Sequence, residues 1–261
     1  MMATTQQLHL GTYAPRVQAR LAALEAARVL PRIWAKEAAV WTADPAQHPA
    51  IVDRLGWLTI PAAMPTRLAE LTRFAGEIRG AGFTHAVLLG MGGSSLFPEV
   101  CRQTFGAGPS GLDLAVLDST DPSAVRAAEA RAPLARTLAI ISSKSGTTAE
   151  VSALARYFYA QFQTAGGPPG AHCLAITDAG TPLEALAKTW KFRRTFVLGP
   201  DTGQEIGGRF SALRFFGLVP AALMGADTSR LLARARAMLG RCGPDGPLTQ
   251  NPAAQLAAAF A

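Results

Sequence analysis

Short apolar runs recur along the chain from residue 84 onward, and most of them end in glycine or in small polar residues. The runs cover residues 84–90, 113–118, 137–143, 172–177 and 195–199. Segments with apolar residues at helical spacing lie between them, at 95–105, 121–131, 147–163 and 181–189. Continuous apolar strands that alternate with helices are typical of a parallel sheet covered on both faces. The pattern therefore predicts an α/β fold, a doubly wound sandwich with a five-stranded parallel sheet.

Helical spacing dominates both ends of the chain. Before the first strand, helices are expected at 15–41 with an interruption at Pro31, within 44–57, and from about Pro65 to Gly80 or Gly82. After the last strand, the segments that resemble helices are 210–227, 228–243 and 251–261. We therefore expect an N-terminal helical extension at 1–64, the α/β sandwich at 65–200, and C-terminal helices at 201–261 that lead toward a second α/β unit.

Composition narrows the class of protein. Apolar residues make up 49% of the 261 positions and charged residues 16%, which is typical of a globular chain. No apolar run is long enough to cross a bilayer and the N-terminus lacks an apolar signal core, so no membrane partner is expected. The net charge of +7 comes from scattered basic residues with few aromatics, which argues against nucleic-acid binding. Three cysteines without disulfide or metal spacing favour a cytoplasmic location.

The stretch SSKSGTTAE at 142–150 follows one of the predicted strands. Within six positions it places four hydroxyls, one glycine and one cation, namely Ser143, Lys144, Ser145, Gly146, Thr147 and Thr148. Hydroxyls and the backbone N–H groups around a glycine can bind the oxygens of a phosphate group. Helix capping by Thr147 or Thr148, with Glu150 in the first turn, is the alternative explanation. One cap accounts for one hydroxyl rather than four, so the pattern favours an anion site.

A second loop, LLGMGGSSLFPEV at 88–100, is a glycine-rich turn between a predicted strand and a predicted helix. Glycines let the backbone approach a ligand, and a helix N-terminus offers free N–H groups. Ser94 or Ser95 can also cap the helix. Leu96 stands where a dinucleotide fingerprint has its third glycine, and no Gly-Lys-Ser/Thr follows, so neither nucleotide motif is matched. Alone, the loop fits an anion site or a simple turn.

Two further loops also lie at strand ends. In DSTDP, at 118–122, Thr120 or Asp121 is expected to cap the next helix, with Pro122 at its first position. In QEIGGRFSAL, at 204–213, paired glycines place Arg209 at a helix start, where the helix dipole disfavours a cation. An anionic ligand or intermediate would explain that arginine, whereas Ser211 is explained as a helix cap.

Taken together, GMGGSSLFPEV, LDSTDP, ISSKSGTTAE and GGRFSALRFFGLVPAAL resemble the phosphoglucose isomerase family. The resemblance is closest to the bacterial branch in which the isomerase part is often fused behind a transaldolase. RIWAKEAAVWTAD and IVDRLGWLTIP also resemble the start of that isomerase part. The similarity follows the family's order over nearly the whole chain. It implies the sugar-isomerase (SIS) fold, in which residues 65–200 form the first of two sandwiches.

The resemblance also implies a reaction and a site. The family interconverts glucose 6-phosphate and fructose 6-phosphate in glycolysis and gluconeogenesis, through an enediolate and without a metal or other cofactor. Arg209 corresponds to the family arginine that steadies the enediolate, and a fixed cation is effective at a developing oxyanion. The family match implies phosphate binding by Gly93, Ser94, Ser143, Ser145 and Thr148, with Lys144 and Thr147 adjacent. A sugar phosphate is thus the expected small-molecule partner, and a homodimer is expected for the full-length protein.

Part of the family pattern has no match in these 261 residues. The family's glutamate base, and the histidine and lysine that follow it, belong to segments that this chain does not contain. We therefore interpret the chain as the N-terminal portion of an isomerase, inactive alone. Arg214 also departs from the family, which has a small polar residue there. Two alternatives stay open: a non-catalytic SIS module that senses a phosphosugar, and a nucleotide-binding domain, which the imperfect glycine fingerprint disfavours.

Overall fold

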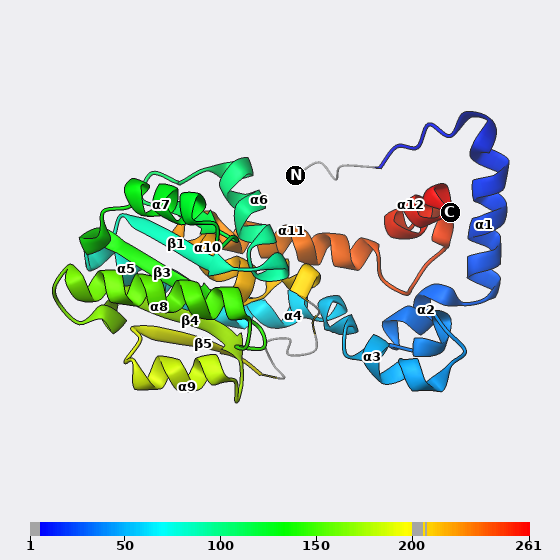
Figure 1. Cartoon of the computed structure of the whole chain (residues 1–261). Coiled ribbons are helices and arrows are strands. Elements are labelled where there is room, and N and C mark those ends of the chain that lie inside the picture. The colour runs from blue at the N-terminus through cyan, green and yellow to red at the C-terminus, as the bar shows by residue number, and fades with distance from the viewer. Residues whose placement is uncertain (1–5, 200–205, 207) are drawn as a thin grey trace.

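The computed structural model describes residues 6–199, 206 and 208–261. At its centre is a parallel sheet of five strands in the order β2-β1-β3-β4-β5 (Figure 1). The strands are β1 (His85–Gly90), β2 (Asp113–Leu117), β3 (Thr137–Ser142), β4 (Cys173–Asp178) and β5 (Arg194–Leu198). Each lies within one residue of the apolar run that predicted it, so the predicted α/β fold class is confirmed.

The order of the strands reverses at β1. After β1 the chain adds β2 on one side, and then crosses to add β3 on the other side of β1. β1 and β3 pair along their whole length, and Gly90 at the end of β1 lies opposite Ser142 at the end of β3. Ligands of open parallel sheets bind beyond the carboxyl ends of the strands where the order reverses. The two loops that follow β1 and β3 therefore occupy the favoured position for a site.

Helices cover both faces of the sheet, so its strands are buried on both faces. One layer, α7 (Pro122–Arg131), α8 (Ala149–Thr164) and α9 (Pro182–Thr189), packs on the face that includes Val87 and Leu89. The other face, which includes Ala86 and Leu88, is covered by α5 (Leu68–Gly80), α6 (Leu96–Phe105) and α10 (Phe215–Leu223). Successive side chains of one strand point to opposite faces, so a continuous apolar run fills two cores.

The N-terminal region forms α1 (Ala14–Ala26), α2 (Val29–Trp34), α3 (His48–Val52) and α4 (Ile60–Ala63). The expected interruption at Pro31 was wrong in position, because the helix breaks at Arg28, which has a left-handed φ of 50°. Pro31 lies instead in the first turn of α2. Backbone N–H groups of the first turn make no hydrogen bond within the helix, so a proline there costs none. The last helix, α12 (Pro252–Phe260), packs against α1 at one end of the molecule (Figure 1).

The region after β5 differs in part from the expected helix over 210–227. A 3-10 helix, Gly208–Leu213, comes first, and Arg214 is extended before α10 begins. α11 (Thr228–Arg241) then runs from the sheet toward α12 (Figure 1). Ile60 precedes the predicted sandwich in the sequence and Phe215 follows it, but both belong to one apolar core together with residues of the sandwich. The division of the chain into three parts stays a prediction. Within the described ranges, no helix combines the length and apolarity needed to span a membrane.

Candidate functional site

The loop after β3 folds back on itself through hydroxyl contacts. Ser143 is 3% exposed, and its Oγ lies 3.1 Å from the Thr148 Oγ1. The same Oγ accepts a hydrogen bond of 3.1 Å from the Gly146 N–H, and Gly146 has a φ of +67°. A left-handed φ favours glycine, so this residue permits the turn that closes the loop. The structure thus brings together the hydroxyls of Ser143 and Thr148, two of the residues assigned to phosphate binding from the sequence, and that assignment stays a prediction.

The other two hydroxyls of the loop form a second pair on its outer side. The Oγ of Ser145 lies 2.8 Å from the Oγ1 of Thr147 and accepts a hydrogen bond of 3.2 Å from the Thr147 N–H. Both residues are exposed. A hydroxyl has one donor and two acceptor positions, so each pair keeps capacity for a further partner. All four hydroxyls of the loop lie at the carboxyl end of the sheet, before α8 begins.

Helix capping does not explain these hydroxyls. Thr148 is the N-cap residue of α8, but its side chain accepts no hydrogen bond from the helix backbone. The capping interpretation of Thr147 or Thr148 was therefore wrong. The first N–H groups of α8 receive no side-chain cap, and they carry the positive end of the helix dipole. Such a helix start, next to paired hydroxyls, suits an anion.

The glycine-rich loop after β1 lies beside this one. A Cβ atom on Gly90 would meet the Cβ atoms of Ser94 and Ser142 at 3.2 Å and 3.3 Å. The Ser142 Oγ also donates a hydrogen bond of 3.3 Å to the Ser94 carbonyl oxygen. Ser95 was expected as a possible cap of α6, but its Oγ donates to the Gly92 carbonyl oxygen at 3.0 Å instead. Ser94 is thus joined to the residue that precedes Ser143.

Gly93 brings the Arg209 segment to the same edge of the sheet. A Cβ atom on Gly93 would lie 2.0 Å from the carbonyl carbon of Gly208, so only glycine permits this approach. The side chain of Arg209 does not join the hydroxyls, however. It is exposed and lines an apolar cavity of about 700 Å³ with Trp57 and Phe210. The structure therefore places the backbone of the arginine segment near the loop after β1, and among the described residues no hydrogen bond joins Arg209 to the four hydroxyls.

A small cavity borders the paired hydroxyls. It has a volume of about 140 Å³, and its lining includes Ser143, Gly146 and Thr148. Arg156 of α8 and Leu183 of α9 line it from the helical layer. By the same measure one water needs about 10–15 Å³, so the cavity has room for an anion and its hydration. Arg156 was not among the predicted site residues, because nothing in its local sequence distinguishes it from other basic positions of an amphipathic helix.

A buried ion pair, which the sequence had not indicated, lies behind the loop after β3. The Arg214 side chain is fully buried, with one terminal nitrogen 3.3 Å from the Asp178 Oδ1 and the other donating 2.9 Å to the Ile206 carbonyl oxygen. The Lys144 Nζ lies 3.7 Å from the Asp178 Oδ2. Asp178 therefore links Lys144 of the loop to Arg214. The Arg214 Nε is buried and has no hydrogen-bond partner in the part of the chain that the structure describes.

Burial shifts the pKa values of both members of this pair. Loss of hydration raises the pKa of the Asp178 carboxyl, and the charges of Arg214 and Lys144 oppose that rise. Burial lowers the pKa of Arg214 to about 10, which Asp178 opposes. The guanidinium therefore stays charged at neutral pH. Two sequence signals could have indicated the pair: an aspartate directly at the carboxyl end of a strand, and an arginine inside an otherwise apolar run.

The family model for phosphoglucose isomerase matches residues 62–257 of this chain, which is most of its length. The chain belongs to the phosphoglucose isomerase family. A glucose-6-phosphate isomerase from Geobacter sp. (strain M21) is 31% identical over 220 residues, and one from Cyanothece sp. (strain PCC 7425 / ATCC 29141) is 33% identical over 221. Each alignment covers 77% of this chain and 41% of the relative. The chain thus spans less than half the length of these curated family members.

Two solved structures share the fold of this chain. A hypothetical protein from Thermus thermophilus matches with a TM-score of 0.77 at 29% identity, covering 95% of this chain and 54% of that one. A glucose-6-phosphate isomerase from Chlamydia trachomatis D/UW-3/Cx matches with a TM-score of 0.71 at 23% identity, covering 94% and 49%. The second match shows the shared fold. In both, this chain of the phosphoglucose isomerase family corresponds to about half of the solved chain.

Proposed function

We propose that this chain binds a sugar phosphate and supplies part of the active site for the interconversion of glucose 6-phosphate and fructose 6-phosphate. The observation that carries the proposal is the folded loop after β3, where Ser143 and Thr148 lie 3.1 Å apart beside the uncapped start of α8. Small donors around a helix N-terminus bind phosphate well. Membership of the phosphoglucose isomerase family supports a sugar phosphate as the ligand.

The phosphate group is assigned to the two loops beyond β1 and β3. In this proposal its oxygens accept hydrogen bonds from hydroxyls and backbone N–H groups of Gly93, Ser94, Ser143, Ser145, Thr147 and Thr148. Lys144 adds positive charge, although its ion pair with Asp178 offsets part of that charge. Phosphate binding fixes the far end of the substrate and leaves the carbonyl end free for chemistry. Binding energy from a non-reacting group can be used in this way to position the reacting atoms.

Arg209 is assigned to the reacting end of the sugar. A proton moves between the first two carbons through an enediolate, and a guanidinium beside the developing negative charge stabilises that state. The contact of Gly93 with Gly208 supports this role, because it holds the adjacent residue near the phosphate loops. Arg209 lines the apolar cavity in this structure, and in this proposal ligand binding turns its side chain toward the sugar.

The phosphate site can be tested by titrating the chain with fructose 6-phosphate in a calorimeter. The double variant Ser143→Ala/Thr148→Ala should abolish the binding signal, because it removes both hydroxyls of the inner pair. A matched control is Ser229→Ala/Thr164→Ala, which removes two hydroxyls from exposed positions on α11 and α8. Unchanged affinity in the Ser143/Thr148 variant would show that the sugar phosphate binds elsewhere.

The role of Arg209 needs a ligand that resembles the enediolate. An aldonate phosphate of five carbons carries a planar carboxylate where the enediolate forms. It should bind more tightly than fructose 6-phosphate, and Arg209→Ala should remove that advantage while leaving fructose 6-phosphate affinity nearly unchanged. Arg236→Ala is the control, since Arg236 is exposed on α11. A chain that only senses phosphosugars, the alternative function, would show no preference for the aldonate.

We do not expect the chain alone to catalyse the isomerisation. No residue of the described site is assigned as the base, so we expect the 261-residue chain to show negligible isomerase activity in a coupled assay. Addition of a polypeptide that carries the rest of a family member is expected to be required. Robust turnover by the chain alone would mean that a base lies within these residues. We further propose a cytoplasmic protein that forms a homodimer at full length.

A further inference from the structure

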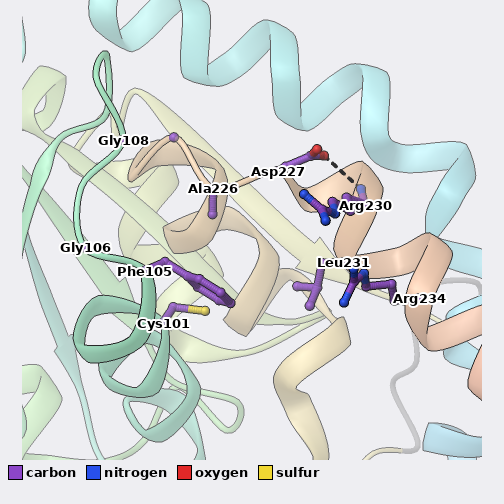
Figure 2. Close-up of a pocket in the computed structure, with 10 residues that line it drawn as sticks. Cys101, Phe105, Gly106, Gly108, Ala226, Asp227, Arg230, Leu231 and Arg234 are labelled. Carbon is purple, nitrogen blue, oxygen red and sulfur yellow. Dashed lines mark hydrogen bonds between the residues drawn. The ribbon is translucent and has the colours of Figure 1, made fainter. Parts of the chain in front are cut away.

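A second cavity lies near the amino end of β2, at the opposite end of the parallel strands from the two loops assigned to phosphate binding. It has a volume of about 430 Å³ and lies between the end of α6, the segment before β2, and the start of α11 (Figure 2). The phosphate loops follow the carboxyl ends of β1 and β3, whereas this cavity adjoins the segment that enters β2. None of its lining residues belongs to the proposed sugar-phosphate site, so this inference does not depend on that function.

The inner wall of the cavity is apolar. Cys101 is 1% exposed, and Phe105, at the end of α6, is 61% exposed. Leu231 of α11 faces them across the cavity (Figure 2). An exposed phenylalanine at the mouth of a cavity offers a flat surface on which a planar ring of a ligand can stack. This wall therefore favours a ligand with an aromatic or similarly flat apolar part.

Two cations line the other side. Arg230 and Arg234 are one turn apart on α11, and both line the cavity (Figure 2). Among the described residues, neither guanidinium makes an ion pair or a side-chain hydrogen bond, and Asp227 is engaged by the Arg230 backbone N–H at 2.8 Å. Like charges one helical turn apart repel each other. An anion between the two arginines would remove that repulsion, and guanidinium groups bind phosphate or carboxylate through two parallel hydrogen bonds.

The remaining wall is built from closely packed backbone, which gives the cavity a defined shape. The Gly108 N–H donates a hydrogen bond of 2.8 Å to the Met224 carbonyl oxygen. A Cβ atom on Gly111 would lie 1.8 Å from that same oxygen, and one on Gly108 would lie 3.0 Å from the Gly225 carbonyl oxygen. Gly225 also has a φ of +80°. The segment before β2 is therefore held against the turn between α10 and α11 without space for side chains.

We propose that this cavity binds a small molecule that joins a flat apolar ring to an anionic phosphate or carboxylate group. The ring stacks on Phe105 and contacts Leu231, and the anion is held by Arg230 and Arg234. The site is separate from the sugar-phosphate site and requires an aromatic body that a sugar phosphate lacks. Both parts of the ligand are needed, because the arginines are exposed and the apolar wall is small.

Phenyl phosphate is a suitable probe, with inorganic phosphate and benzyl alcohol as the two partial ligands. In calorimetric titrations of the full chain, phenyl phosphate should bind at least about tenfold more tightly than either partial ligand. Arg230→Gln/Arg234→Gln should weaken phenyl phosphate binding about tenfold or more, since charge-assisted hydrogen bonds are lost. Phe105→Ala should weaken phenyl phosphate but leave inorganic phosphate unchanged. Arg236→Gln on the same helix is the matched control and should have no effect.

The phosphate loops provide the test of location. Ser143→Ala/Thr148→Ala should leave phenyl phosphate binding intact even if it abolishes fructose 6-phosphate binding, so failure of one proposal is distinguishable from failure of the other. The inference is overturned if phenyl phosphate binds no better than inorganic phosphate, or if the double arginine variant binds it with wild-type affinity. All the substituted arginines and Phe105 are exposed, so the variants are expected to fold, and circular dichroism would verify this.

Discussion

At the scale of single residues, the least expected feature is a fully buried arginine. Arg214 keeps its charge near neutral pH and has Asp178 as its carboxylate partner, at 3.3 Å. Its Nε has no partner among the described residues, so the pair is imperfectly satisfied. A buried ion pair contributes little net stability over apolar residues of similar size, but removing one partner leaves the other charge without compensation. Removal of either partner is therefore expected to lower the stability of the fold next to the loop after β3.

We expect Asp178→Asn to lower the free energy of unfolding by about 3–5 kcal/mol, because the variant leaves a buried guanidinium without a counter-ion. Urea denaturation followed by circular dichroism measures the change. The matched control is Glu77→Gln, which removes the carboxylate from the exposed Arg73–Glu77 pair, where the two side chains are 68% and 59% exposed. That substitution should cost less than about 1 kcal/mol. Similar losses in both variants would contradict the importance of burial.

Contacts within one loop of the site were predictable from the sequence, whereas contacts between distant residues were not. Ser143 and Thr148 were predictable because residues five apart in one loop meet locally, and a strand end fixes where the loop lies. Asp178 and Arg214 are 36 residues apart, and the contact between them depends on how the chain returns to the sheet after β5. The direction of the Arg209 side chain was not predictable either, since a flexible side chain follows the surfaces around it rather than its local sequence.

At the scale of elements, the strands were predicted well and the helix ends less well. A strand buried on both faces needs an unbroken apolar run, and few other structures require one. Helix starts are decided by competing hydrogen bonds. Asp121 caps α7 as expected, accepting from the Ser123 and Ala124 N–H groups, but Ser95 and Thr148 bond within their loops instead. Ser211 also does not cap α10, which begins after Arg214. Each hydroxyl can form hydrogen bonds with several nearby groups, and the local sequence does not show which of these hydrogen bonds forms.

The contact between the loop after β1 and the 3-10 helix at Gly208–Leu213 leads to a second prediction. Gly93→Ala would place a Cβ atom 2.0 Å from the Gly208 carbonyl carbon, so one of the two backbones must move. We expect a loss of about 1–3 kcal/mol in stability, as is typical of overpacking. We also expect weaker fructose 6-phosphate binding, because the phosphate loop shifts with it. Thermal unfolding and calorimetry measure the two effects.

Gly80→Ala is the control for that substitution. Gly80 ends α5 without a positive φ, and, apart from its chain neighbours and the backbone of its own helix, no atom of the described residues lies within 4 Å of the position where its Cβ would stand. Alanine there should be neutral or slightly stabilising, since it reduces the freedom of the unfolded chain. If Gly93→Ala were equally harmless, the approach of the two glycines would be looser than the structure shows, and the Arg209 segment would not be held at the site by this contact.

At the scale of the whole molecule, the two ends of the chain form a small core apart from the sheet. Val17 and Leu21 of α1 pack with Ala254 and Ala258 of α12 and with Leu248. The apolar cavity of about 700 Å³ lies between these helices and the segment around Phe210, so part of the apolar surface between the two regions is not filled. The sheet, by contrast, is packed on both faces by two larger cores. A small core next to a cavity is expected to open without unfolding the rest.

Hydrogen exchange can test this, and the chain offers a matched pair of helices. α1 and α5 both have 13 residues, but α1 packs on α12 whereas α5 packs on the sheet. We expect the amides of α1 to exchange with an opening free energy at least about 2 kcal/mol below that of α5, because helices depend on packing more than on their own hydrogen bonds. Mass spectrometry of peptides from both helices measures the difference. Equal protection would mean that the terminal helices open only when the sheet unfolds, and that the cavity between them does not weaken their attachment.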